Sequence, residues 1–199
     1  MEGEHDGALE LDGSTTMISV PASDSLTSLE APMTVGAILE IVEFPVDWQS
    51  LAAMYPNDKC SNDDRVNGWK CGFHNVNPTT TRWLDTDYDA TSIILETGKR
   101  YYLVYVFNSE DAKFYVDGEL EQSMPAPDLE GINVDSPLHI GVEEGIGNYY
   151  LHAILDEFWI SNVEKSEKEI KEFASPESML SVSSKGKLAT MWGKVKHFQ

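Results

Sequence analysis

The stretch Tyr101–Leu120, YYLVYVFNSEDAKFYVDGEL, predicts three β-strands joined by two tight turns. Its first seven residues are apolar and, apart from Leu103, β-branched or aromatic, which is typical of a strand buried on both faces. Apolar and polar residues then alternate around Phe114 and Val116, and Asp117-Gly118 suits a two-residue hairpin turn with positive φ angles. Such a meander needs a second sheet to cover it.

The size of the chain favours one all-β domain, because a β-sandwich of 199 residues has enough core to fold alone. No apolar run is long enough to cross a bilayer, so we expect no membrane insertion and a soluble chain. The first residues, Met1–Glu4, have neither the basic start nor the apolar centre of a signal peptide.

The chain is strongly acidic, with a net charge of −20 and a pI near 4.4. Binding to nucleic acid is therefore not expected, because no basic surface is available to neutralise phosphates, and anionic membranes are disfavoured for the same reason. The simplest interpretation is a solvated acidic surface that keeps the protein monomeric. A surface dedicated to binding cations is the alternative.

The two cysteines, Cys60 and Cys71, bracket the polar loop SNDDRVNGWK, and we predict a disulfide between them. Closing a loop of this size would stabilise the fold by about 2–3 kcal/mol, and the bridge would indicate an oxidising compartment. Two free thiols are the alternative. Zinc binding is not expected, because neither cysteine has a Cys or His neighbour at zinc spacing.

Further strands are expected on both sides of the meander, from runs of apolar residues bounded by turn residues. They are Ala8–Val20 as two strands with a turn at Asp12-Gly13-Ser14, Met33–Phe44, Ala52–Tyr55, Gly68–His74 and Thr81–Leu84 as a hairpin separated by Asn-Pro, Pro137–Val142, and Ala153–Ile160.

One short surface helix is predicted at Ser166–Phe173, where Ser166 and Glu169 match the S-x-x-E capping box. The segment Lys185–Gln199 then holds four lysines and no acidic residue. Because a basic segment tends to dock on an acidic body, we predict that KLATMWGKVK forms a final strand packed on the domain. A flexible tail that binds a partner is the alternative.

The order of the motifs resembles the laminin G-like domains of the concanavalin A-like lectin and glucanase superfamily. The motifs are GALELDG at Gly7–Gly13, ISVPASDSL at Ile18–Leu26, TGKRYYLVYVFN at Thr97–Asn108, KFYVDGEL at Lys113–Leu120, SPLHIG at Ser136–Gly141 and LDEFWISN at Leu155–Asn162, followed by the capped helix. The resemblance implies an all-β, two-sheet antiparallel jelly-roll sandwich over residues 1–175, with a C-terminal extension at 176–199. It says little about the ligand.

Two features depart from the family pattern. Family members often begin with a strand upstream of the GALELDG segment, so the C-terminal KLATMWGKVK segment is a hypothetical occupant of that sheet edge. The region Trp48–Asp89 is acidic and irregular, whereas the family usually has short hairpins there. We expect ligand contacts in this region.

A structural calcium ion is the cofactor that the resemblance implies, held by Asp156 with oxygens of the first turn at Asp12 and with Asp24. The residues give a reason to look at Asp156, because strict alternation puts it on the same face as Phe158 and Ile160. A buried carboxylate needs a partner, and hard oxygen ligands suit calcium. The alternative is that Asp156 caps loop amides or pairs with a lysine.

A second acidic cluster imitates an EF-hand loop, because Asp85, Asp87, Asp89 and Glu96 stand at relative positions 1, 3, 5 and 12. The required glycine is replaced by Ala90, and strands flank the cluster where an EF-hand has helices. We interpret it as an accidental acidic loop.

Sugar binding would require exposed aromatic rings that stack on pyranose rings, with amides and carboxylates bonding the hydroxyls. Packing in the core or on a sheet surface is the alternative for each candidate. The candidates in or beside loops are Tyr55, Trp69, Trp83, Tyr88, Tyr149 and Tyr150.

Catalysis is not expected. Glucanases of this fold carry E-x-D-x-E or E-x-D-x-x-E on one strand, which places the acid and the nucleophile on one face. The nearest approaches here, Glu4-His-Asp6 and Glu10-Leu-Asp12, lack the second glutamate. No G-x-S-x-G motif and no glycine-rich phosphate loop occur either.

The sequence therefore predicts a non-catalytic binding module, extracellular or at the cell surface, within a larger protein. Its partner would be a glycan or a cell-surface protein. Carbohydrate binding on loops or on the concave sheet is the first hypothesis, and aromatic residues exposed together on one face would favour it. A protein-adhesion or spacer domain without a sugar site is the second, favoured by a face of Lys, Thr and aliphatic residues. A divergent hydrolase is the third.

Overall fold

The predicted meander is present as three antiparallel strands, β8 (Arg100–Phe107), β9 (Asp111–Val116) and β10 (Glu119–Pro125). In β8, residues 101–107 are all buried, as expected for a strand covered on both faces. At the second turn, Asp117 and Gly118 have φ angles of 51° and 87°, the left-handed values of a type I′ hairpin. The turn chemistry and the burial of this segment are confirmed.

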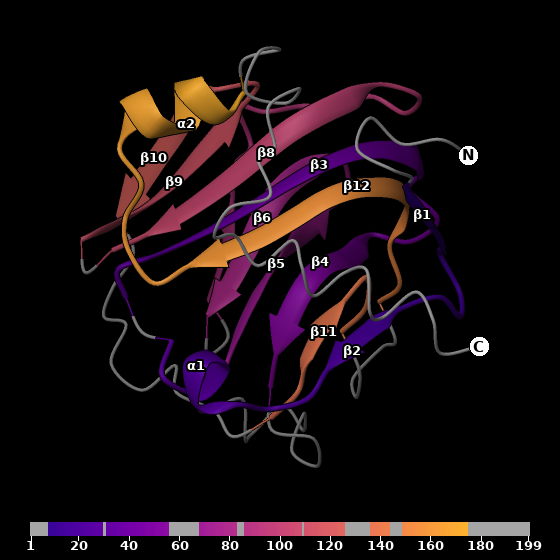
Figure 1. Ribbon diagram of the computed structural model, residues 1–199. Helices are drawn as coiled ribbons and strands as arrows, with labels where there is room; N and C mark the ends of the chain where they lie inside the picture. The colour runs from indigo at the N-terminus through magenta and orange to yellow at the C-terminus, as the bar shows by residue number, and fades with distance from the viewer. Residues whose placement is uncertain are drawn as a thin grey trace.

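The computed structural model describes residues 8–29, 31–55, 68–82, 86–108, 110–125, 136–143 and 149–174, which form two six-stranded antiparallel sheets (Figure 1). The first sheet has the order β1-β12-β3-β8-β9-β10 and adds β1 (Leu9–Asp12), β3 (Met33–Glu43) and β12 (His152–Ser161). The second sheet has the order β2-β11-β4-β5-β6-β7. Its strands are β2 (Ile18–Val20), β11 (Leu138–Ile140), β4 (Trp48–Met54), β5 (Trp69–His74), β6 (Asn77–Arg82) and β7 (Thr86–Asp89). The predicted two-sheet sandwich is confirmed.

The core lies between the two sheets and is formed by the inward side chains of both. Among its fully buried members are Trp69 and Phe73 from the second sheet and Tyr105 and Phe114 from the first. The Tyr105 hydroxyl donates a hydrogen bond to the Gly72 carbonyl at 3.0 Å, which ties the sheets together. Burial raises the pKa of this phenol well above its usual value, so it stays a donor.

The outer face of the first sheet is covered by α2 (Glu167–Phe173), which Figure 1 shows lying across β9 and β10. We call it the helix-covered face. Ile170 of α2 is fully buried there. The sheet residues buried with it are Ile38, Tyr102, Val104, Val106 and Tyr115. The predicted capping box is confirmed, because the Ser166 hydroxyl accepts from the Glu169 amide and the Glu169 carboxylate accepts from the Ser166 amide.

Three local predictions were wrong. The hairpin of β5 and β6 turns at Asn75-Val76, not at the Asn-Pro pair, because Asn75 adopts a left-handed φ of 54° that asparagine tolerates well. Pro78 lies inside β6, opposite Phe73. The acidic loop around Asp87 contains a strand, β7, and a single helical turn, α1 (Asp24–Thr27), follows β2.

No helix in the described part of the chain is both long enough and apolar enough to span a bilayer. Residues 176–199 lie outside the described residues, so the final strand there and the boundary at residue 175 stay predictions.

Candidate functional site

The outer face of the second sheet carries charged and aromatic side chains where the first sheet carries apolar ones. In β5, Trp69, Cys71 and Phe73 belong to the core. Because side chains alternate along a strand, Lys70 and His74 point to the opposite, outer face. The register places Trp48 of β4 beside His74 on this face.

An ion pair between Lys70 and Glu143 is buried on this outer face. The Lys70 Nζ lies 2.9 Å from the Glu143 Oε2, and the two side chains are 5% and 6% exposed. The Ser50 hydroxyl donates to the same carboxylate at 3.4 Å. The Lys70 Nζ also lies over two aromatic rings, 4.8 Å from the centroid of Trp48 and 5.7 Å from that of Tyr149. The lysine therefore neutralises the carboxylate and holds two ring faces by cation–π attraction.

A second polar group adjoins the first through the Trp48 ring. The imidazole of His74 stacks on it with centroids 3.9 Å apart and planes 5° apart. The His74 Nδ1 lies 2.6 Å from the Asp89 Oδ2 and, because a carboxylate only accepts, this nitrogen donates. Thr79 donates its hydroxyl to the other Asp89 oxygen at 2.6 Å. These bonds fix the orientation of the imidazole, while His74 and Asp89 remain 31% and 25% exposed.

We call these residues the aromatic–charged face: Trp48, Ser50, Lys70, His74, Thr79, Asp89, Glu143 and Tyr149. Trp48, Tyr149, His74 and Asp89 are partly exposed, while Lys70 and Glu143 lie beneath them. The half-exposed ring of Tyr149 can stack on the apolar side of a sugar, and an imidazole and a carboxylate can bond its hydroxyl groups. The arrangement thus has the chemistry of a ligand-binding surface.

The predicted aromatic candidates divide between the core and this face. Trp69 lies in the core and is 2% exposed. Tyr55 is 8% exposed, and a Cβ on Gly68 would overlap its ring. The prediction that these two rings are exposed platforms was wrong. Tyr149 joins the aromatic–charged face, and Tyr150 is half-buried. Trp83 lies outside the described residues, and Tyr88 is described only by its backbone in β7.

Of the three predicted calcium ligands, Asp12 holds the first turn together. Its Oδ1 accepts the amides of Ser14, Thr15 and Thr16 at 2.7 to 2.9 Å, and its Oδ2 accepts the Thr15 hydroxyl at 2.6 Å. The Thr15 hydroxyl and these amides hold the pKa of the carboxyl far below its usual range. The carboxylate therefore has a structural role in the turn.

Asp156 pairs with Arg100 on the outer side of the first sheet. The prediction that it shares the core face of Phe158 was wrong, because a register shift between Leu155 and Glu157 interrupts the alternation of β12. Leu155 before the shift and Phe158 after it both belong to the core, so Asp156 falls at the irregularity. The alternative of a basic partner is closer to the structure, with an arginine in place of the lysine.

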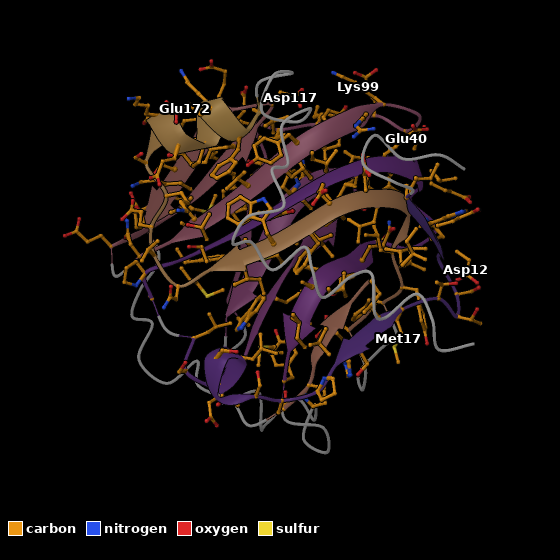
Figure 2. All side chains as sticks on the ribbon, in the orientation of Figure 1. Asp12, Met17, Glu40, Lys99, Asp117 and Glu172 are labelled. Carbon is orange, nitrogen blue, oxygen red and sulfur yellow. The ribbon has the colours of Figure 1, made fainter. Side chains whose placement is uncertain are left out.

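These three carboxylates do not converge. Asp12 lies opposite His152, four residues from Asp156 along β12, which puts the two about 13 Å apart along the strand. Asp24 is exposed on α1, which lies at the lower left in Figure 1. Asp12 is labelled at the right of Figure 2, which has the same orientation, so the two residues lie far apart. No cluster of three metal-ligating side chains occurs among the described residues. The predicted set therefore does not fit a calcium ion, and calcium itself stays a prediction.

The remaining predicted residues lie elsewhere. Cys71 is buried in the core from β5, and Cys60 lies outside the described residues, so the disulfide stays a prediction. Asp89, from the EF-hand-like cluster, bonds His74 and Thr79. This contact agrees with the interpretation that the cluster is not an EF-hand.

The family model described as concanavalin A-like lectin/glucanases superfamily matches residues 12–171. The chain belongs to the concanavalin A-like lectin/glucanases superfamily. This confirms the resemblance drawn from the sequence motifs. No curated protein matches the chain.

Solved structures of the same fold have low sequence identity to this superfamily member. The CBM40 domain of the Ruminococcus gnavus IT-sialidase is 14% identical with a TM-score of 0.67, over 85% of this chain and 97% of that one. Domain 4 of AbnA, a GH43 extracellular arabinanase from Geobacillus stearothermophilus solved with arabinotriose, is 14% identical with a TM-score of 0.66, over 88% and 80%. The binding domain of botulinum neurotoxin serotype G is 14% identical with a TM-score of 0.65, over 85% and 42%. At these identities the likeness shows a lectin-like fold.

Several residues of the aromatic–charged face were missed as site residues from the sequence of this superfamily member. They are Trp48, Ser50, Lys70, His74, Thr79 and Glu143. Most lie in the Trp48–Asp89 region, which was singled out as the most individual part of the chain. The signal was present in WKCGFH of β5, where polar side chains alternate with core residues. Glu143 could not be found in this way, because it follows β11 and meets Lys70 only in the folded chain.

Proposed function

We propose that this chain is a non-catalytic carbohydrate-binding module and that the aromatic–charged face is its sugar site. The observation that carries the proposal is the convergence of Trp48, Tyr149 and His74 on one outer sheet face, with the Asp89 carboxylate beside them. Aromatic rings gathered on one face, with polar groups at their edges, suit the alternating apolar and hydroxyl surfaces of a sugar ring.

The similar folds support a glycan as the ligand class. The Ruminococcus gnavus CBM40 has been solved with α2,3-sialyllactose and the arabinanase domain with arabinotriose. A secreted or cell-surface location is part of the proposal, because the glycans that such a module would meet are outside the cell. The module would then bring a larger protein to a glycan.

The lack of catalysis is also part of the proposal. The two carboxylates of the face are engaged in fixed contacts, Glu143 with Lys70 and Asp89 with His74 and Thr79. A glycosidase needs one carboxyl group as proton donor and another as nucleophile or base beside the scissile bond. Neither carboxylate is held for such a role.

The test is a glycan array followed by calorimetric titration of the sugars that bind, with calcium and with chelator. Trp48→Ala removes the ring between His74 and Lys70, and we expect it to weaken binding by about tenfold. Phe173→Ala is the matched control, because it removes a partly exposed aromatic ring from α2 and leaves the second sheet untouched. An unchanged affinity in Trp48→Ala would place the site elsewhere.

One observation favours a second candidate, a protein-adhesion or spacer domain. Lys70 and Glu143 are almost completely buried, and such a pair can serve packing alone. An array that shows no sugar binding in either buffer would support this candidate and reject the first.

A further inference from the structure

We propose that the aromatic–charged face selects uncharged glycans and discriminates against acidic sugars such as sialic or uronic acids. The inference rests on the proposed function and names the ligand class of the same site. The selectivity follows from how the charges of the face are arranged.

The ammonium group of the face is buried and already paired with a carboxylate. A sugar carboxylate forms its strongest hydrogen bonds with a cationic donor that can approach it. The Lys70 ammonium is 2.9 Å from the Glu143 carboxylate and lies over the rings of Trp48 and Tyr149, with only 5% of its side chain exposed. An incoming anion would have to displace Glu143 to reach it.

A ligand first meets the partly exposed His74 and Asp89. The His74 imidazole directs its Nδ1 hydrogen to Asp89, so the Asp89 carboxylate, 25% exposed, compensates any positive charge on that ring. His139 of β11 lies in line with Ala53 and Lys70 but is only 8% exposed. The Glu143 carboxylate balances the Lys70 ammonium and the Asp89 carboxylate stands beside the His74 imidazole, so these groups offer an incoming anion no uncompensated positive charge.

The rest of the molecule also repels anions. The chain carries a net charge of −20, and its field adds repulsion of acidic ligands at a distance. Salt screens this long-range part but leaves the short-range pairing of Lys70 with Glu143 in place. The aromatic rings remain attractive to neutral pyranose faces at any salt concentration.

The experiment compares neutral oligosaccharides with their own sialylated derivatives, printed side by side on an array and then titrated in chelator-containing buffer. We expect each sialylated form to bind at least about fivefold more weakly than its neutral parent, and the ratio to shrink as salt is raised. Asp89→Asn keeps the shape of the side chain but removes its charge, so it should reduce the ratio. Glu10→Gln on β1 of the other sheet makes the same change in net charge and should change the ratio far less than Asp89→Asn does.

The outcomes separate this inference from the proposed function. Binding of sialylated forms with equal or higher affinity than their neutral parents overturns the inference and leaves the glycan-binding proposal intact. Equal effects of Asp89→Asn and Glu10→Gln would assign the discrimination to total charge and overturn the role of this face. Absence of binding to every sugar overturns the proposed function and the inference with it.

Discussion

The outer faces of the two sheets bury different kinds of side chain. On the first sheet, apolar residues such as Ile38 and Tyr102 are buried beneath Ile170 of α2. On the second sheet, Lys70 and Glu143 are buried beneath aromatic rings. The inward side chains of both sheets form the same core, so the two sheets differ in their outward side chains. The apolar set needs a permanent cover, and the helix supplies it. The charged and aromatic set stays partly exposed and can meet a ligand.

Each outer face also depends on a glycine. A Cβ at Gly36 of β3 would overlap the indole of Trp159, which lies on the helix-covered face with Phe173. A Cβ at Gly72 of β5 would overlap the backbone of Gln49, beside the register shift of β4. The first glycine makes room for a side chain that packs under the helix. The second allows two strands to approach closely where Trp48 and Lys70 meet.

The largest expected effect comes from breaking the ion pair of the second sheet. Glu143→Ala leaves the Lys70 ammonium buried without its carboxylate, and we expect the free energy of unfolding to fall by about 3–5 kcal/mol in denaturant titration. Glu172→Ala in the exposed Lys168–Glu172 pair of α2 is the control and should stay within about 0.5 kcal/mol of the parent.

Replacing both partners sharpens this test. The double variant Lys70→Met with Glu143→Leu removes both charges and keeps apolar volume, so we expect most of the lost stability to return. We expect the double variant to bind sugar more weakly than the parent does, because Trp48 and Tyr149 lose their cationic partner. If the double variant recovered stability and also bound sugar as the parent does, the pair would have no part in the site.

The next effect separates the helix-covered face from the sugar site. Ile170→Ala leaves a cavity between α2 and the first sheet, and we expect a loss of about 2–5 kcal/mol of stability. Ile94→Ala is the matched control, because Ile94 is 69% exposed and the same substitution there should cost less than about 0.5 kcal/mol. The affinity for sugar, measured where both variants are folded, should equal that of the parent. A reduced affinity in Ile170→Ala would show that the two faces are coupled.

A smaller effect is expected at the start of α2. Ser166→Ala removes the hydroxyl that bonds the Glu169 amide and carboxylate, and we expect a loss of about 1 kcal/mol at neutral pH. Bonds from the Ser166 backbone and side chain, followed by Lys165, lower the pKa of Glu169 from 4.5 to about 2.

The sign of the pH dependence follows from that shift. Because the folded pKa is below the unfolded one, Glu169 contributes stability above pH 4.5, and this contribution is lost as the pH falls toward 2. Denaturant titrations of parent and Ser166→Ala should therefore differ more at neutral pH than near pH 2. A difference that does not change with pH would exclude the carboxylate from the cap.

The sequence was sufficient where a local pattern determines the structure. The alternation of Phe114 and Val116, the Asp117-Gly118 turn and the Ser166 capping box each depend on residues a few positions apart, and each was predicted correctly. The region that holds most of the candidate site was also recognised, from its composition.

The sequence was insufficient where one residue shifts a register or where distant residues meet. The irregularity at Asp156 inverts the alternation of β12, and nothing in LDEF marks it. Trp69 looked like an exposed platform because it follows a polar loop, yet it is the first core residue of β5. The contact of Lys70 with Glu143 joins residues 70 and 143, which only the folding of the second sheet brings together.

The smallest expected effect is that of calcium on the melting temperature. Its measurement tests whether the charges on both outer faces are neutralised within the protein. Asp12 is occupied by its own turn and Asp156 by Arg100, just as Glu143 is occupied by Lys70. Since a calcium ion needs six or more oxygen ligands, it would have to displace these partners. We therefore expect Asp12 and Asp156 to bind no calcium, so that Asp156→Asn lowers the melting temperature equally in calcium and in chelator. A rise in melting temperature with calcium would mean that the ion is bound by other oxygen ligands, and Asp24→Asn would then show whether α1 supplies one of them.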